Sequence, residues 1–104
     1  MILKNLLTGL YVKNPLTEAS LEQHIRGVAD NSQEVQADYL FIALSGHNQD
    51  GHSYIEDAIK KGASVVLGEK DLTNLPVPYL QVENSRKALG IIAKNFYGNP
   101  AKQN

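Results

Sequence analysis

Residues 39–66 read YLFIALSGHNQDGHSYIEDAIKKGASVV, a stretch in which the hydrophobic pattern changes from one segment to the next. Residues 39–44 form an apolar run that is short enough for a strand and too uniformly apolar for an exposed one. A polar loop follows, and apolar residues then recur at helical spacing between Ile55 and Ile59. Residues 63–67 are again apolar, so the stretch predicts a strand, a loop, a helix and a second buried strand.

The two ends of this predicted helix carry recognisable signals. Ser53 and Glu56 have the spacing of a capping box, in which a hydroxyl and a carboxylate satisfy backbone donors at a helix start. The helix is therefore expected to begin near Tyr54. Gly62 is placed to end it in a left-handed conformation, which glycine adopts without steric cost.

Two polar segments follow predicted strands. Residues 45–53 form a polar loop at the carboxyl end of the strand at residues 39–44, where open α/β sheets bind small molecules. Residues 30–33 follow a short strand predicted at residues 25–29. In a layered sheet these two loops can converge on one rim. Composition alone leaves two interpretations open, a binding site and two ordinary turns.

The remaining segments complete an alternating pattern. Residues 3–10 place leucines at helical spacing, and residues 77–82 have the composition of a strand. Asn84 is suited to cap a last helix that ends near Gly98. Gly90 lies inside that helix, where close packing against another backbone would explain it. The chain is predicted to have a layered α/β/α fold with a small mixed sheet.

Length and composition exclude several classes of function. The 104 residues correspond to a single domain, residues 1–104, with no sign of a second. The absence of cysteine excludes disulfides and thiolate metal sites, and a formal net charge of −1 gives no basic surface for nucleic acid. The apolar runs are too short to cross a membrane, and residues 1–13 lack the pattern of a signal peptide. We therefore expect a cytoplasmic protein that binds neither nucleic acid nor a membrane.

Catalytic and metal-binding patterns are weak. His47, Asp50 and His52 fall within one loop, but their spacing matches no established zinc pattern and their types are typical of a turn. Ser32 lacks the G-x-S-x-G context of a nucleophile. Neither G-x-G-x-x-G nor the phosphate loop G-x-x-x-x-G-K-[ST] occurs. The sequence therefore predicts no ATP site and no metal site in this chain, and we assign no catalytic residue.

A series of short motifs in a fixed order covers essentially the whole chain. Its members are Asn31-Ser32-Gln33, Leu40-Phe41-Ile42-Ala43-Leu44, Gly46-His47, Asp50-Gly51-His52, Tyr54-Ile55, Ala58, Gly62-Ala63, Ser85-Arg86-Lys87-Ala88-Leu89 and Phe96-Tyr97-Gly98-Asn99-Pro100. In this order the motifs resemble the N-terminal domain of the Mur ligases, and among these they look most like MurE.

The resemblance implies a role in peptidoglycan precursor synthesis. In such ligases ATP phosphorylates the terminal carboxylate of a UDP-MurNAc-peptide, and the amine of an amino acid attacks the acyl phosphate. ATP and Mg²⁺ belong to a central domain and amino-acid selection belongs to a C-terminal domain, both of which are absent from this chain. The N-terminal domain holds the UDP moiety of the precursor, UDP-MurNAc-dipeptide for MurE. This chain alone is therefore expected to bind the precursor and to be catalytically inactive.

The family pattern places the UDP contacts in two segments. Asp30 and Ser32 would lie against the uridine. The contacts from the facing loop would be His47, Asn48 and Gln49. The family usually has Asp-Ser-Arg where this chain has Asn31-Ser32-Gln33, so amides replace both charged members. We therefore expect no ion pair or cationic contact from these residues.

Two alternatives to MurE stay open. The N-terminal domain of MurF shares the strand and the Asp-Gly loop pattern, although the ending Phe96-Tyr97-Gly98-Asn99-Pro100 favours MurE. The second alternative is a non-catalytic regulatory or interaction domain. The chain is similar in general fold to a domain that also serves as the N-terminal domain of a bacterial protein kinase/phosphorylase. The rim of its sheet would then contact a partner in place of UDP.

Overall fold

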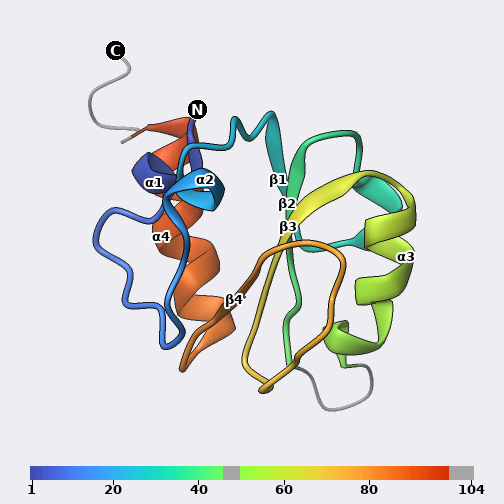
Figure 1. Cartoon of the computed structure of the whole chain (residues 1–104). Helices are drawn as coiled ribbons and strands as arrows, with labels where there is room; N and C mark the ends of the chain where they lie inside the picture. Colours follow the sequence, from blue (N-terminus) through green and yellow to red (C-terminus); the bar gives the residue numbers. More distant parts are fainter. Residues whose placement is uncertain (46–49, 99–104) are drawn as a thin grey trace.

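A four-stranded parallel sheet forms the centre of the protein (Figure 1). The computed structural model describes residues 1–45 and 50–98. The strands lie side by side in chain order, and each neighbouring pair is parallel. They are β1 (Gly27–Ala29), β2 (Tyr39–Ile42), β3 (Ala63–Gly68) and β4 (Tyr79–Gln81).

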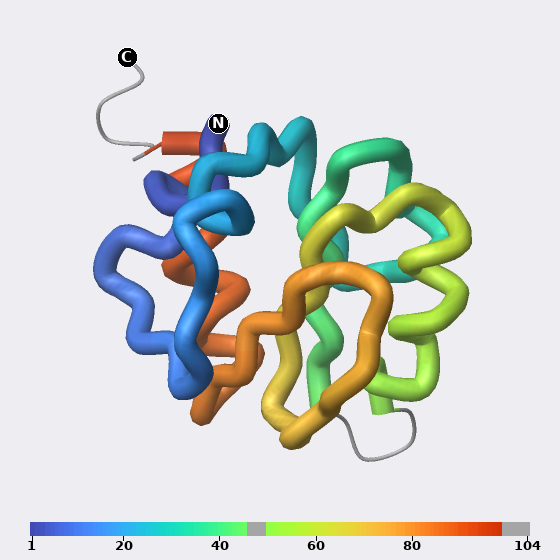
Figure 2. The backbone as a smooth tube through the Cα atoms, in the orientation of Figure 1, coloured from blue at the N-terminus to red at the C-terminus, as the bar shows by residue number. Residues whose placement is uncertain are grey.

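Helices cover both faces of this sheet, as the backbone trace also shows (Figure 2). One face carries α1 (Leu3–Leu6), α2 (Glu18–Leu21) and α4 (Ser85–Tyr97), and the other carries α3 (Ile55–Lys60). Two 3-10 turns precede β2 and α3, namely η1 (Ser32–Glu34) and η2 (Gly51–Tyr54). None of the described helices has the length and apolar character needed to span a membrane. The predicted layered α/β/α class is confirmed.

The sheet is parallel, whereas the sequence analysis expected a mixed one. Residues 30–38, 43–62 and 69–78 join successive strands, and each connection returns the chain to the same end of the sheet. Crossovers of this kind make neighbouring strands parallel, while an antiparallel pair is normally joined by a tight hairpin. The antiparallel pairing found among the described residues is an isolated bridge between Ile2 and His24.

Residues along each strand alternate between two apolar cores. Leu40 and Ile42 belong to the core on the side of α1 and α4, while Phe41 and Ala43 belong to the core on the side of α3. All four side chains are at most 1% exposed. Alternation is the geometry of an extended chain, and burial on both faces makes the run uniformly apolar.

The outer edge of β4 is covered by the segment that follows α1. The Asn14 side chain acts there as a short peptide group, because Nδ2 donates to the Tyr79 carbonyl and Oδ1 accepts from the Gln81 amide, both at 2.7 Å. The Lys13 amide also donates to the Gln81 carbonyl at 2.7 Å. Residues 13–14 thereby satisfy backbone groups that an edge strand would otherwise leave open.

Several predicted helix ends are confirmed. Asn84 caps α4, since its Oδ1 accepts from the Lys87 amide at 3.0 Å, and Gly98 follows the helix with a φ of 84°. Gly62 follows α3 with a φ of 119°. A Cβ at Gly62 would lie 2.8 Å from the Ala37 Cα, so the position is restricted by both conformation and space.

Two other local predictions are wrong. The predicted capping box of Ser53 and Glu56 is absent, because α3 follows Tyr54 without a side-chain cap. The side-chain cap lies one turn earlier, at the start of η2, where the Asp50 side chain accepts from the His52 amide at 3.0 Å. Ser53 donates instead to the Asp50 carbonyl at 2.7 Å. At Gly90, no atom outside the local helix lies within 4 Å of a Cβ position. Close backbone packing therefore does not explain this glycine.

Candidate functional site

A cleft of about 520 Å³ lies at the carboxyl edge of the sheet. Its lining includes residues 30–33, which follow β1, and Leu44, which follows β2. Arg86 reaches it from the first turn of α4. The other lining residues are Phe41, Gly51 and Tyr54. Parallel strands end at the same edge of a sheet, and this brings the loops after β1 and β2 together.

Two of the expected UDP contacts, Asp30 and Ser32, line this cleft. Ser32 is 6% exposed and begins the turn η1. The Asn31 side chain stabilises that turn, since its Oδ1 accepts from the Gln33 amide at 2.9 Å. A hydrogen bond from the Ser32 hydroxyl is the main cause that holds the pKa of Asp57 in α3 below its usual value. The wall formed by η1 is thus tied to α3.

The other three expected contacts, His47, Asn48 and Gln49, lie outside the described residues. The chain on either side of them is well anchored. The Gly51 amide donates to the Leu44 carbonyl at 2.7 Å, so the two ends of the loop are held together at the cleft. The role of residues 47–49 stays a prediction.

His52 connects the turn η2 to the segment after β3. Its side chain is 3% exposed, and Nδ1 lies 2.5 Å from Asp50 Oδ1. Nε2 accepts from the amides of Glu69 at 2.9 Å and Lys70 at 3.3 Å. Because Nε2 accepts hydrogen bonds, the proton of the neutral ring belongs on Nδ1, which donates to Asp50.

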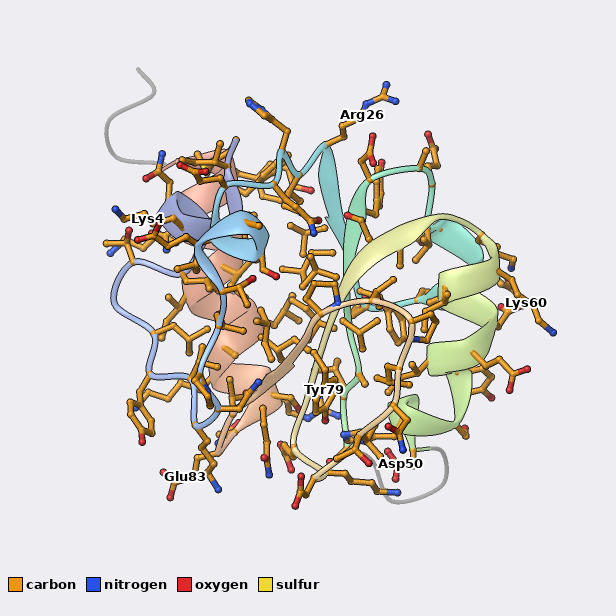
Figure 3. The ribbon with its side chains drawn as sticks, in the orientation of Figure 1. Lys4, Arg26, Asp50, Lys60, Tyr79 and Glu83 are labelled. Carbon is orange, nitrogen blue, oxygen red and sulfur yellow. The ribbon has the colours of Figure 1, made fainter. Side chains whose placement is uncertain are left out.

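The same carboxylate has a second partner, since Lys70 Nζ lies 2.6 Å from Asp50 Oδ2. Figure 3 places Asp50 at the end of the molecule opposite Arg26, which precedes β1. Within the described ranges, no group of three or more His, Asp and Glu side chains is placed to hold a metal ion. The interactions of His52 and Asp50 are therefore accounted for by protein partners.

Acid is expected to destabilise the fold partly through Asp50. Hydrogen bonds from Lys70, and from the amide and ring of His52, hold the pKa of Asp50 well below its ordinary value of 3.8. A carboxyl group with a lowered folded-state pKa contributes fully above its unfolded-state pKa, and the contribution is lost as pH falls toward the folded-state value. Between about pH 6 and about pH 2, Asp50→Asn is therefore expected to lose less free energy of unfolding than the wild type in urea titrations. Equal losses would exclude this role of Asp50.

Glu69 joins the segment after β2 to the start of α4. Its Oε1 accepts from the Ser45 hydroxyl at 3.0 Å, while its Oε2 accepts from the Ser85 amide at 2.8 Å and the Ser85 hydroxyl at 2.9 Å. The Ser85 amide is the main cause that lowers the pKa of Glu69 below its usual value. Arg86 is the next residue, and its Nη2 donates to the Ser45 carbonyl at 3.4 Å. The first turn of α4 is thus fixed beside the cleft.

Sequence reasoning assigned no role to Tyr54 or Arg86, although both line the cleft. A positive charge in the site was considered only at residues 31–33, where this chain has amides. In the structure the positive charge comes from Arg86 in α4. A signal for this placement exists, because α4 follows β4 directly and its first turn must lie near the carboxyl edge of a parallel sheet.

The Mur ligase family model, described as its catalytic domain, matches residues 24–97. This range contains the whole sheet and every residue that lines the cleft. The chain belongs to the Mur ligase family. Its curated relatives include UDP-N-acetylmuramoyl-L-alanyl-D-glutamate–2,6-diaminopimelate ligases, which confirms the predicted likeness to MurE.

Two of these relatives show the extent of the similarity. The ligase of Bacteroides thetaiotaomicron is 42% identical over 106 residues, which cover 99% of this chain and 21% of the relative. The ligase of Clostridium tetani is 36% identical over 89 residues, which cover 82% of this chain and 18% of the relative. The chain therefore spans about a fifth of the length of the curated relatives that it matches.

Solved MurF structures have a similar fold. The UDP-N-acetylmuramoylalanyl-D-glutamyl-2,6-diaminopimelate–D-alanyl-D-alanyl ligase of Acinetobacter baumannii matches with a TM-score of 0.73 at 20% identity, over 90% of this chain and 21% of that one. The MurF ligase of Thermotoga maritima, in complex with ADP, gives a TM-score of 0.58 at 32% identity, over 66% of this chain and 16% of that one. The expected Mur ligase fold is confirmed, and the curated sequence relatives favour MurE over MurF.

Proposed function

We propose that this chain binds the UDP moiety of UDP-MurNAc-dipeptide as the N-terminal domain of an ATP-dependent MurE-like ligase in peptidoglycan precursor synthesis. Membership of the Mur ligase family and the names of the curated relatives support this proposal. The observation that carries it is the position of Asp30 and Ser32, which the family pattern selects and which line one cleft.

The chemistry of the cleft suits a nucleoside diphosphate. Its volume of about 520 Å³ lies in the range of roughly 300–1,000 Å³ that is usual for small-molecule sites. Uracil needs paired donors and acceptors, which the polar residues 30–33 offer. Leu44 supplies apolar surface beside Phe41, which is only 1% exposed, and Tyr54 supplies an aromatic residue that is 38% exposed.

ATP and Mg²⁺ belong, in this proposal, to the remainder of a longer ligase that works in the cytoplasm. The chain has no phosphate loop, and its described residues provide no cluster of metal ligands. The residues present therefore do not fit ATP with Mg²⁺, and no catalytic step is assigned to them. The task proposed for the cleft is binding.

Nuclear magnetic resonance provides the direct test of this proposal. When the ¹⁵N-labelled chain is titrated with UDP-MurNAc-dipeptide, we expect the amide signals around Ser32, Tyr54 and Arg86 to shift. Ser32→Ala is expected to weaken binding roughly two- to tenfold, because a hydrogen bond between neutral groups contributes about 0.5–1.5 kcal/mol.

Ser64→Ala is the matched control for this experiment. The Ser64 hydroxyl is buried without a hydrogen-bond partner in the described part of the chain, and Ser64 does not line the cleft. This variant is expected to bind the precursor like the wild type. Shifts confined to another surface would refute the site, and no binding of the precursor would refute the function.

A further inference from the structure

Arg86 lines the cleft as a cation without an acidic partner. Within residues 1–45 and 50–98, the ion pairs involve other side chains, and no carboxylate lies within 4.0 Å of its guanidinium. Its hydrogen bond to the Ser45 carbonyl, at 3.4 Å, is long for a bond between a nitrogen donor and an oxygen. Most donors of the guanidinium therefore remain available to a ligand in the cleft.

Glu69 holds together the two segments beside this guanidinium. Its two carboxylate oxygens are occupied by hydrogen bonds from Ser45 and Ser85, at 2.8–3.0 Å. Ser85 is 0% exposed, so the start of α4 is held firmly against the segment after β2. The carboxylate thereby fixes the residue before Arg86 and the residue that Arg86 contacts, without forming an ion pair with Arg86 itself.

Two charges in the lining distinguish the two ends of a bound nucleotide. The Asp30 carboxylate repels phosphate, whereas the Arg86 guanidinium matches phosphate oxygens with two parallel donors. A uracil base is neutral and pairs with groups such as those of residues 30–33. The diphosphate therefore belongs beside Arg86, and the base belongs beside residues 30–33.

We propose that Arg86 binds the phosphate groups of a nucleoside diphosphate in this cleft and that Glu69 is its positioning residue. This inference rests on the proposed function, and it names the residue that supplies positive charge to the phosphates in the cleft. Asn31 and Gln33 do not supply that charge, because both are amides. The cation comes instead from a segment far along the chain, which the Glu69 carboxylate links to the loop after β2.

Calorimetry with UDP and with uridine tests the role of Arg86, because the two probes differ only in the phosphates. Arg86→Gln is expected to weaken UDP binding about tenfold or more, since a charge-assisted bidentate contact is lost. Uridine binding should change less than about twofold. Raising the salt concentration should weaken UDP binding to the wild type and have a smaller effect on the variant.

Arg26→Gln is the matched control, because it removes the same charge elsewhere. Arg26 precedes β1 and lies at the end of the molecule opposite Asp50 (Figure 3). This variant is expected to bind UDP and uridine like the wild type. Arg86→Lys keeps the charge and loses the planar fork, so its UDP affinity should fall between those of the wild type and Arg86→Gln.

Glu69→Gln tests positioning separately from stability. It is expected to lower the ratio of UDP affinity to uridine affinity at least about threefold, because the guanidinium is displaced from its place beside the phosphates. A purely structural role would weaken both ligands equally and leave the ratio unchanged. Ser45→Ala removes one hydrogen bond to Glu69 and should lower the ratio in the same direction, which covers the case in which Glu69→Gln does not fold.

The possible outcomes separate this inference from the proposed function. If the folded wild type binds neither UDP nor UDP-MurNAc-dipeptide, the proposed function fails and this inference fails with it. If the wild type binds UDP but Arg86→Gln keeps the wild-type ratio of UDP to uridine affinity, the inference alone fails. An unchanged ratio in both Glu69→Gln and Ser45→Ala would remove the positioning role and leave the phosphate contact in place.

Discussion

Replacing His52 with alanine is expected to lower the free energy of unfolding by about 2–4 kcal/mol. The ring is 3% exposed, and its Nε2 accepts from the amides of Glu69 and Lys70. Truncation leaves both amides without this acceptor and takes away a hydrogen bond from Asp50. A buried polar group left unpaired costs about 1–3 kcal/mol, and the part-buried Glu69 amide carries more of this cost than the exposed Lys70 amide.

His24→Ala provides the control for this substitution, because His24 is an exposed histidine whose bridge to Ile2 is formed by the backbone. Its free energy of unfolding should stay within about 0.5 kcal/mol of the wild-type value. Urea denaturation at neutral pH, followed by circular dichroism, measures both variants. A loss of less than about 1 kcal/mol in His52→Ala would mean that water replaces the ring without cost, and the network would not be structural.

Replacing Phe41 with alanine is expected to cost about 3–5 kcal/mol of stability. Phe41 is 1% exposed in the central strand β2 and packs in the core that α3 covers. Its removal creates a cavity at the centre of the sheet, and the neighbouring strands limit how far the structure can relax. Phe41 also lines the cleft, so we expect weaker binding of UDP as well.

Two variants bracket the Phe41 result. Phe41→Leu retains most of the apolar volume and should cost less than about 1.5 kcal/mol. Tyr11→Ala truncates an aromatic side chain that is 74% exposed, and it should change stability by about 0.5 kcal/mol at most. Thermal and urea denaturation of the three variants would contradict the description of the core if Phe41→Ala and Tyr11→Ala lost similar amounts.

The strands and α4 were predictable because their signals are local. Residues 39–44 were too uniformly apolar for an exposed strand, and β2 does contribute to both cores. Asn84 and Gly98 mark the ends of α4, since caps depend on particular residues at fixed offsets. The strands β1 and β4 are shorter than the predicted residues 25–29 and 77–82, because pairing with neighbouring strands sets their ends.

The cleft was predictable only in part, because its lining comes from segments that are distant in the chain. Asp30 and Ser32 could be selected through the family pattern and the polar turn after β1. Arg86 and Glu69 have roles that depend on where α4 begins relative to β2, and no local pattern encodes that relation. The cap of η2 at Asp50 was not predictable either. Several neighbouring polar residues are suited to cap a helical turn, and the path of the loop decides which of them does so.

The covering of β4 by Asn14 has a consequence for how this chain behaves in a crowded solution. An open edge strand can recruit the same strand of another molecule, which leads to aggregation. Asn14 and Lys13 already occupy backbone groups of Tyr79 and Gln81, and β1 at the other edge is only 3 residues long. In the part of the chain that the structure describes, the sheet therefore offers a poor template for edge-to-edge assembly, and its carboxyl rim stays open to small ligands.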